Sequence, residues 1–188
     1  VVVTTAREEL RGDRLILSTG AWMQPELAAL GVPLVVERQT MHWFDARQDA
    51  PRRPVLIVGD GQDHATVIFP ARNGLVKAAS HGSNDTAAPD DIERSVTLED
   101  VTPVARLLDR WIPGDAGAHR RGATCLYTRT PSGHFILDRH PAYPQVVLAS
   151  PCNGFGFKFA SAVGEGLAAL ALDAAPPISL APWRLRLP

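Results

Sequence analysis

The sequence predicts an α+β fold with an antiparallel sheet, arranged as one large domain or two small ones. Short runs of β-branched and apolar residues follow one another with turn residues between them, which is typical of neighbouring antiparallel strands. One segment differs, because its apolar residues recur at helical spacing and predict an amphipathic helix over 98–111. Its apolar face consists of Val101, Val104, Leu107, Leu108 and Trp111.

Composition narrows the class of protein. The 188 residues are 45% apolar and 21% charged, which is ordinary for a globular protein long enough to bury a core. Nineteen basic and twenty acidic residues give a net charge of −1, without the basic face of a nucleic-acid binder. No apolar run approaches the roughly 20 residues that cross a bilayer. We therefore expect neither nucleic acid nor membrane as a partner.

The N-terminus suggests that the chain is the middle of a longer protein. It begins with Val1 rather than Met, and it lacks the charged start and apolar region of a signal peptide. We therefore expect a cytoplasmic protein, in which Cys125 and Cys152 stay reduced.

The first two thirds of the chain read mainly as strands. A small-residue turn at Gly20 closes the second strand, and Gly31 and Pro33 end a short helix over 25–30. Residues 6–13 read as a charged turn and 83–90 as a polar loop. The predicted strands cover 1–4, 14–18, 34–44, 54–58, 66–70 and 75–79.

The last third is predicted to alternate strands with tight turns before a final helix. A strand over 123–128 returns through a hairpin at 130–133 as a strand over 135–138. A further strand over 146–149 leads through a glycine-rich loop into an apolar helix over 157–172. The tail from 180 to 187 should lie extended.

Two motifs in this last third carry the functional argument. Thr124-Cys125-Leu126-Tyr127-Thr128 places a lone cysteine inside a β-type run. Asn153-Gly154-Phe155-Gly156-Phe157-Lys158-Phe159 is a glycine-spaced aromatic loop before a helix. Such a loop lets backbone N–H groups and the positive helix end approach a planar or anionic ligand.

Together the two motifs resemble the C-terminal region of the monomeric sarcosine oxidase and N-methyltryptophan oxidase family, FAD-dependent enzymes that oxidise secondary amines. The resemblance implies the C-terminal portion of an FAD-dependent oxidoreductase. Residues 1–30 would end the FAD-binding domain, and 31–117 would form a substrate-binding domain with an antiparallel sheet and a helix. Residues 118–188 would return to the FAD-binding domain with the flavin-facing loop and the last helix.

The resemblance also implies roles for single residues. Cys125 would carry the FAD covalently, and Lys158 would bind the carboxylate of the substrate beside Phe155 and Tyr127. Lys77, four residues before His81, would help oxygen accept electrons, and both count as catalytic candidates. Residues placed against the FAD would be Gly20, Cys125, Tyr127, Gly154, Phe155, Gly156, Phe157 and Lys158.

Each assignment has a plainer alternative. From spacing alone, Cys125 is a small buried side chain on a strand, Lys77 is a solvated lysine on a short strand, and Lys158 is a solvated lysine in a first helical turn. The spacing of the His, Asp and Cys residues fits no recognised metal site.

The implied activity is the oxidation of a secondary or N-methyl amino acid, with an imine and hydrogen peroxide as products. The partners would be a small amine, oxygen and the missing N-terminal FAD-binding half or a companion chain. The chain holds no G-x-G-x-x-G turn for the FAD pyrophosphate, so we expect it to bind FAD weakly by itself.

A rival hypothesis is a truncated, non-catalytic relative that serves as an interaction module or subunit, with Phe155 and Trp43 in its binding surface. Apolar surface exposed by the missing half would favour association, including with a second copy of the chain.

Overall fold

The computed structural model describes residues 1–47, 53–59 and 65–187. The chain forms two compact units: the first combines Val1–Val36 with Tyr127–Pro188, and the second is Glu37–Leu126. The two boundaries lie six and nine residues after the predicted ones at 30 and 117. The functional roles that the sequence assigns to these segments stay predictions.

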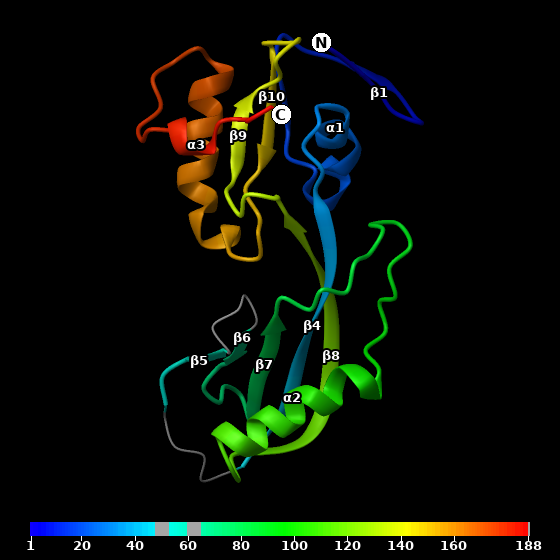
Figure 1. The fold of residues 1–188 in the computed structure, drawn as a ribbon, viewed down its shortest axis with the longest axis vertical. Helices are drawn as coiled ribbons and strands as arrows, with labels where there is room; N and C mark the ends of the chain where they lie inside the picture. The colour runs from blue at the N-terminus through cyan, green and yellow to red at the C-terminus, as the bar shows by residue number, and fades with distance from the viewer. Residues whose placement is uncertain (48–52, 60–64, 188) are drawn as a thin grey trace. The chain divides into compact units, whose positions relative to one another are not determined.

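The first unit is built on a three-stranded sheet with the order β3-β10-β9. The central strand β10 runs parallel to β3, with Leu148 opposite Leu17, and antiparallel to β9, with Leu148 opposite Asp138. Helix α3 lies on one side of the sheet and α1 on the other (Figure 1). The bounds are β3 Leu15–Leu17, α1 Gln24–Ala29, β9 Ile136–Arg139, β10 Val146–Ser150 and α3 Ala160–Ala171.

Strand β10 is buried along its whole length because both of its faces are covered. Val147 and Ala149 belong to one apolar cluster with Val163 and Leu167 of α3. On the opposite face, the alternate residues Val146 and Leu148 pack in a second cluster with Met23, Leu27 and Leu34. This double packing fixes the end of β10, from which the glycine loop emerges.

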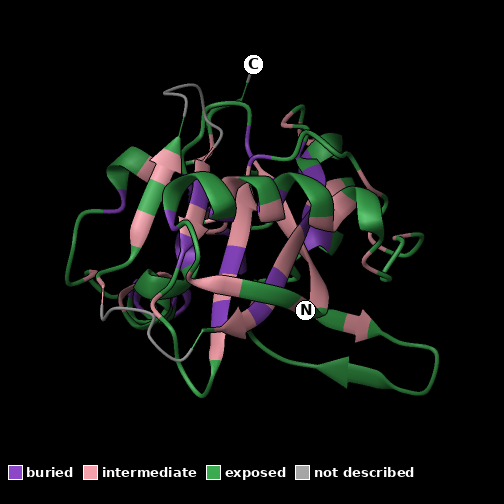
Figure 2. Ribbon diagram, turned by 90° about the horizontal axis from the view of Figure 1, so that it is seen from below, coloured by how far each residue is buried: buried purple, intermediate pink, exposed green. Residues whose placement is uncertain are grey.

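The N-terminal hairpin, β1 (Val2–Thr4) with β2 (Glu9–Arg11), is exposed along nearly its whole length (Figure 2). The prediction of a simple charged turn over 6–13 is wrong at β2. Glu9, Leu10 and Arg11 pair with β1 although their sequence shows no buried alternation.

The second unit confirms the predicted antiparallel sheet. Its five strands have the order β5-β6-β7-β4-β8, and helix α2 crosses one face (Figure 1). Phe44, Ile68 and Val76 from the strands form a core with Val104 and Leu108 from α2. The bounds are β4 Val35–Ala46, β5 Leu56–Gly59, β6 Ala65–Ile68, β7 Leu75–His81, α2 Leu98–Trp111 and β8 Ala116–Arg129.

Most bounds differ from the predicted ones by one or two residues, and the largest differences are at the starts of β8 and of the last helix. Strand β8 begins at Ala116 rather than at 123, because hydrogen bonding to β4 extends it through a polar stretch that has no apolar pattern. The last helix begins at Ala160, because 156–159 form a short 3₁₀ helix, η2 (Gly156–Phe159), ahead of it. Residues 181–183 likewise form a 3₁₀ turn within the tail expected to be extended.

Candidate functional site

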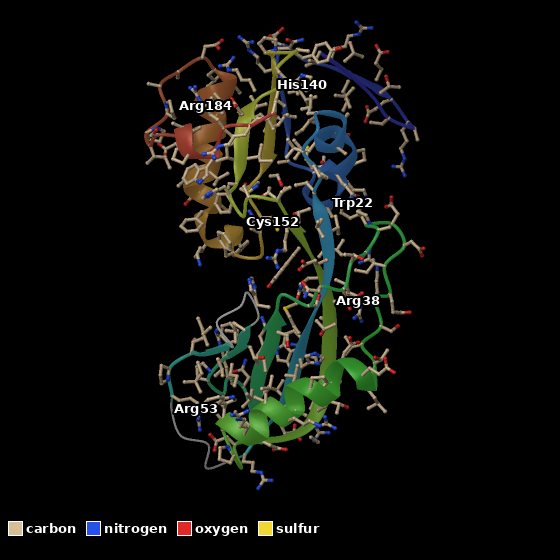
Figure 3. All side chains as sticks on the ribbon, viewed as in Figure 1. Trp22, Arg38, Arg53, His140, Cys152 and Arg184 are labelled. Atoms are coloured by element: carbon tan, nitrogen blue, oxygen red, sulfur yellow. The ribbon has the colours of Figure 1, made fainter. Side chains whose placement is uncertain are left out.

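In the first unit, two of the predicted FAD-binding segments leave the sheet at the same edge. Strands β3 and β10 are parallel neighbours, so their carboxyl ends lie side by side. The turn at Gly20 and the 3₁₀ helix η1 (Gly20–Met23), which carries Trp22, follow β3. The loop that contains Cys152 and Gly154 follows β10; Trp22 and Cys152 are labelled in Figure 3. Carboxyl ends of parallel strands are the usual ligand-binding edge of such sheets.

Gly20 leaves open space at this edge. Its φ of +59° is a conformation that side-chain-bearing residues rarely adopt, and a Cβ placed there would meet no atom within 4 Å. A ligand can therefore approach this stretch of backbone closely.

Asn153 fixes the glycine loop to the neighbouring hairpin. Its side chain is buried, and its backbone has the left-handed conformation, with a φ of +48°. Its side-chain oxygen accepts the Thr130 N–H at 2.9 Å. Its amide nitrogen donates to the carbonyls of Gly133 and His134 at 3.2 and 3.1 Å. Gly154 follows at φ +79°, so two successive left-handed residues turn the chain at this point. Asn153 was not among the predicted site residues.

The backbone at Phe155 and Gly156 differs from the expectation for this loop. Both N–H groups donate to the carbonyl of Cys152, at 3.1 and 3.0 Å, and so are already satisfied within the loop. Gly156 is needed for packing instead, because a Cβ at this position would lie 1.6 Å from the carbonyl oxygen of Pro151.

Aromatic rings fix the other side of the loop. Phe155 and Phe159 pack against buried Phe135, with ring centroids 5.4 and 6.0 Å away. The Lys158 ammonium lies 6.0 Å from the Phe155 ring and 5.5 Å from the Phe159 ring. Phe157 is 95% exposed. The loop therefore presents a cation beside partly exposed rings.

In the second unit, Lys77 projects from the face of the sheet that α2 leaves open. Its neighbours on β7, Val76 and Ala78, pack toward α2, so strand alternation directs Lys77 the other way. Its ammonium lies 5.4 Å from the Trp43 ring and 5.2 Å from the Phe69 ring.

His81, half-buried at the end of β7, shares the alternation of Lys77. It is one of the residues that line a cavity of about 740 Å³, together with Arg38, Ser80 and Asp100. Lys77 and Cys125 do not line this cavity, so its size does not identify it as the site of the predicted chemistry.

Cys125 lies on the edge strand β8 and is half-buried. Two cations that precede it on the same strand, Arg120 and Arg121, are both engaged. Arg120 pairs with Asp45 through contacts of 2.6 Å, and the Arg121 guanidinium stacks 3.8 Å from the centre of the Trp43 ring. Because Asp45 offsets its charge, Arg120 is a poor source of a positive field for a Cys125 thiolate.

Tyr127, two residues on, is half-buried in the first unit. Cys152, the second thiol, is also half-buried, and its sulfur accepts the N–H of Thr128 at 3.4 Å.

An ion pair between Arg38 of β4, which is labelled in Figure 3, and Asp100 of α2 fastens the helix of the second unit to its sheet. The contacts are 2.8 and 3.0 Å, and the side chains are only 11% and 16% exposed. Hydrogen bonding to Arg38 holds the pKa of Asp100 at about 2. Asp100 also completes a capping box with Thr97. The pair therefore has a structural role, which the separate sequence positions did not reveal.

Beneath α2, two histidine rings lie 5.5 Å apart, from His42 on β4 and His119 on β8. Burial, followed by the neighbouring His119, lowers the pKa of fully buried His42. Within the described part of the chain, His42 Nδ1 and His119 Nε2 have no hydrogen-bond partner. Both residues pack against Phe44, so they belong to the core of this unit.

A match to a family model assigns this arrangement of sheets and loops to the FAD-dependent oxidoreductases. Residues 1–170 match the family model described as DAO, FAD dependent oxidoreductase, and the chain belongs to this family. The resemblance that the two motifs indicated is thereby confirmed, and FAD is the cofactor of the family.

Curated relatives include monomeric sarcosine oxidase from Streptomyces avermitilis, 36% identical over 191 residues. N-methyl-L-tryptophan oxidase from Escherichia coli strain SMS-3-5 is 29% identical over 192 residues. These alignments cover 96% and 98% of this chain but 50% of each relative. The chain therefore spans about half the length of the curated relatives that it matches.

Solved structures agree on the fold. NikD, an amino acid oxidase of nikkomycin biosynthesis, matches in its open form with a TM-score of 0.74 over 99% of this chain and 51% of NikD, at 18% identity. A modified fructosyl peptide oxidase from Aspergillus nidulans matches with a TM-score of 0.76 over the whole chain and 49% of that oxidase, also at 18% identity.

Two kinds of feature are absent from the described residues. None of their helices combines the length and apolarity that crossing a membrane requires. They also contain no group of three or more His, Cys, Asp or Glu side chains placed to hold a metal ion.

Proposed function

We propose that the chain supplies the C-terminal half of an FAD-dependent oxidase that converts secondary or N-methyl amino acids to imines and produces hydrogen peroxide. The observation that carries the proposal is the parallel pairing of β3 with β10, which brings the Gly20 turn and the glycine loop to one edge. Backbone open to close approach at Gly20 fits a large cofactor there. Bound FAD would take electrons from the amine and pass them to oxygen.

The residues of this chain would bind and orient the substrate and would stabilise charge on oxygen. Lys158, beside the partly exposed ring of Phe155, would hold the substrate carboxylate, with Tyr127 as a further substrate contact. Lys77 would stabilise charge that develops on oxygen, and His81 lies four residues further along the same strand face. No comparison supports the rival hypothesis of a non-catalytic interaction module.

Cys125 is expected to be the point of flavin attachment, because it stands in the Thr124–Thr128 run that carries the family resemblance. In the whole FAD-loaded protein, mass spectrometry of proteolytic peptides should find the added flavin mass on the peptide that contains Cys125. Cys125→Ser should release the flavin on acid precipitation.

Cys152→Ser is the matched control, since Cys152 is the other half-buried thiol and should leave attachment intact. Active, flavin-loaded protein with an unmodified Cys125 would contradict the assignment.

Phe155 is expected to favour substrates with an aromatic side chain. It packs on Phe135 yet remains 43% exposed, so one part of its ring is available to a substrate. Covering about 50 Å² of apolar surface contributes roughly 1 kcal/mol, or about fivefold to tenfold in kcat/KM. Phe155→His should reduce the preference for N-methyl aromatic amino acids over sarcosine by about that factor.

The measurement is the ratio of the two kcat/KM values in each variant. Tyr143→His offers a control, because the Tyr143 side chain is 57% exposed and lies outside the glycine loop. A wild-type preference for sarcosine, or a ratio unchanged by Phe155→His, would remove Phe155 from the substrate site.

A further inference from the structure

Two cations share one indole ring on the open face of the second unit. The Lys77 ammonium lies 5.4 Å from the centre of the Trp43 ring, and the Arg121 guanidinium carbon lies 3.8 Å from it. Both distances are within the range of about 6 Å over which aromatic faces attract cations. Trp43 is thus in contact with the lysine to which the proposed function gives the oxygen chemistry.

The sheet itself imposes this contact. Strands β4 and β7 are antiparallel, and their register places Trp43 directly opposite Lys77. Directly opposed residues project their side chains to the same face, with Cβ atoms about 5 Å apart. Phe69 follows β6, the neighbour of β7 on its other edge; its ring centre lies 5.2 Å from the ammonium, and its N–H donates to the Lys77 carbonyl at 2.8 Å.

Lys77 is held by rings rather than by a carboxylate. In the described ranges of the chain it makes no ion pair, whereas Arg38, Arg120 and Arg139 do. The distinction matters electrostatically, since a carboxylate would neutralise the ammonium while aromatic faces attract it and leave its net charge intact. A cation that stabilises developing negative charge needs that net charge.

We propose that Trp43 is a positioning residue for Lys77. Its ring, stacked on Arg121, holds the ammonium in place with its charge undiminished, and Phe69 completes the aromatic enclosure. The inference rests on the proposed function, which assigns Lys77 to the reduction of oxygen.

The test is a double-mutant cycle in the whole FAD-loaded protein, with the reductive and oxidative halves of the reaction followed separately by stopped-flow absorbance. Trp43→Leu should slow the oxidative half by about 10-fold, as expected for losing a strong cation–π contact, and leave the reductive half within about twofold. Trp43→Phe should restore most of the rate. In a Lys77→Met background, Trp43→Leu should have no further effect.

The outcomes separate the two proposals. If Lys77→Met leaves the oxidative half unchanged, the oxygen role of Lys77 is wrong, and the positioning role of Trp43 falls with it. If Lys77→Met slows that half but Trp43→Leu does not, or slows it equally in both backgrounds, only the inference about Trp43 is overturned.

A second variant guards against a Trp43→Leu protein that does not fold. Phe69→Leu removes the other ring of the enclosure and should slow the oxidative half by about threefold, again only when Lys77 is present. An unchanged rate in Phe69→Leu, with Trp43→Leu unfolded, would also overturn the proposal.

Discussion

Replacing Lys77 with methionine is expected to slow the oxidative half of the reaction by at least about 100-fold, while the reductive half changes far less. The size of the effect is that of removing one preorganised electrostatic stabiliser. Methionine keeps the length and apolar stem of lysine, so its contacts with Trp43 and Phe69 can persist without the charge. The measurement is the return of flavin absorbance when the substrate-reduced protein is mixed with oxygen.

Lys158→Met provides the matched control, because it removes the other lysine to which the proposed function gives a role. It should weaken binding of the substrate carboxylate and the reductive half, and leave the reaction with oxygen within a few-fold. If Lys77→Met slows both halves equally, Lys77 has a structural role and not the proposed one.

Gly156→Ala is expected to destabilise the first unit by about 3 kcal/mol or more. The added Cβ would lie 1.6 Å from the carbonyl oxygen of Pro151 and 2.7 Å from its carbon, so backbone must move. That movement would disturb the Cys152 carbonyl, which accepts the N–H groups of Phe155 and Gly156. Denaturant unfolding should report the loss of stability, and FAD titration of the whole protein should report weaker binding.

Gly164→Ala, one helix turn into α3, makes the comparison sharp. A Cβ there meets nothing within 4 Å, and alanine favours a helix interior by up to about 1 kcal/mol over glycine. This variant should therefore be neutral or more stable. Equal stabilities for the two variants would show that the close approach of Gly156 to Pro151 is not required.

Local pattern was enough to predict most of the elements. The apolar spacing of 98–111 gave α2 with its bounds, and Thr97 with Asp100 forms the capping box that starts it. Alternating or β-branched runs predicted the strands of the second unit. Because α2 covers one face of that sheet, apolar residues recur at every second position of the strands.

Contacts between distant segments could not be predicted in this way. The parallel pairing of Leu17 with Leu148 joins strands more than a hundred residues apart, and neither strand carries a signal for the other. The start of β8 was missed because hydrogen bonds to β4, rather than apolar side chains, hold its polar residues.

The same distinction between local sequence and distant contacts applies to the candidate site. Family resemblance singled out Lys77, Cys125 and Lys158, and their roles stay predictions. The surroundings of these residues came only from the fold: the register that sets Trp43 against Lys77, and the ion pair that occupies Arg120. Asn153 did have a visible signal, since asparagine before glycine favours left-handed turns.

The second unit is inserted into the first, and this insertion favours an order of folding. The end of β4 and the start of β8 lie next to each other in space, because the N–H of Arg47 donates to the carbonyl of Asp115. The two neighbouring strands therefore run antiparallel. Folding of residues 37–126 therefore brings positions 36 and 127 together. The length of flexible chain in the loop between β3 and β10 then falls to about a third. This lowers the entropy cost of closing the loop by about 1 kcal/mol. The sheet that carries the glycine loop should thus form late, on a unit that has already folded.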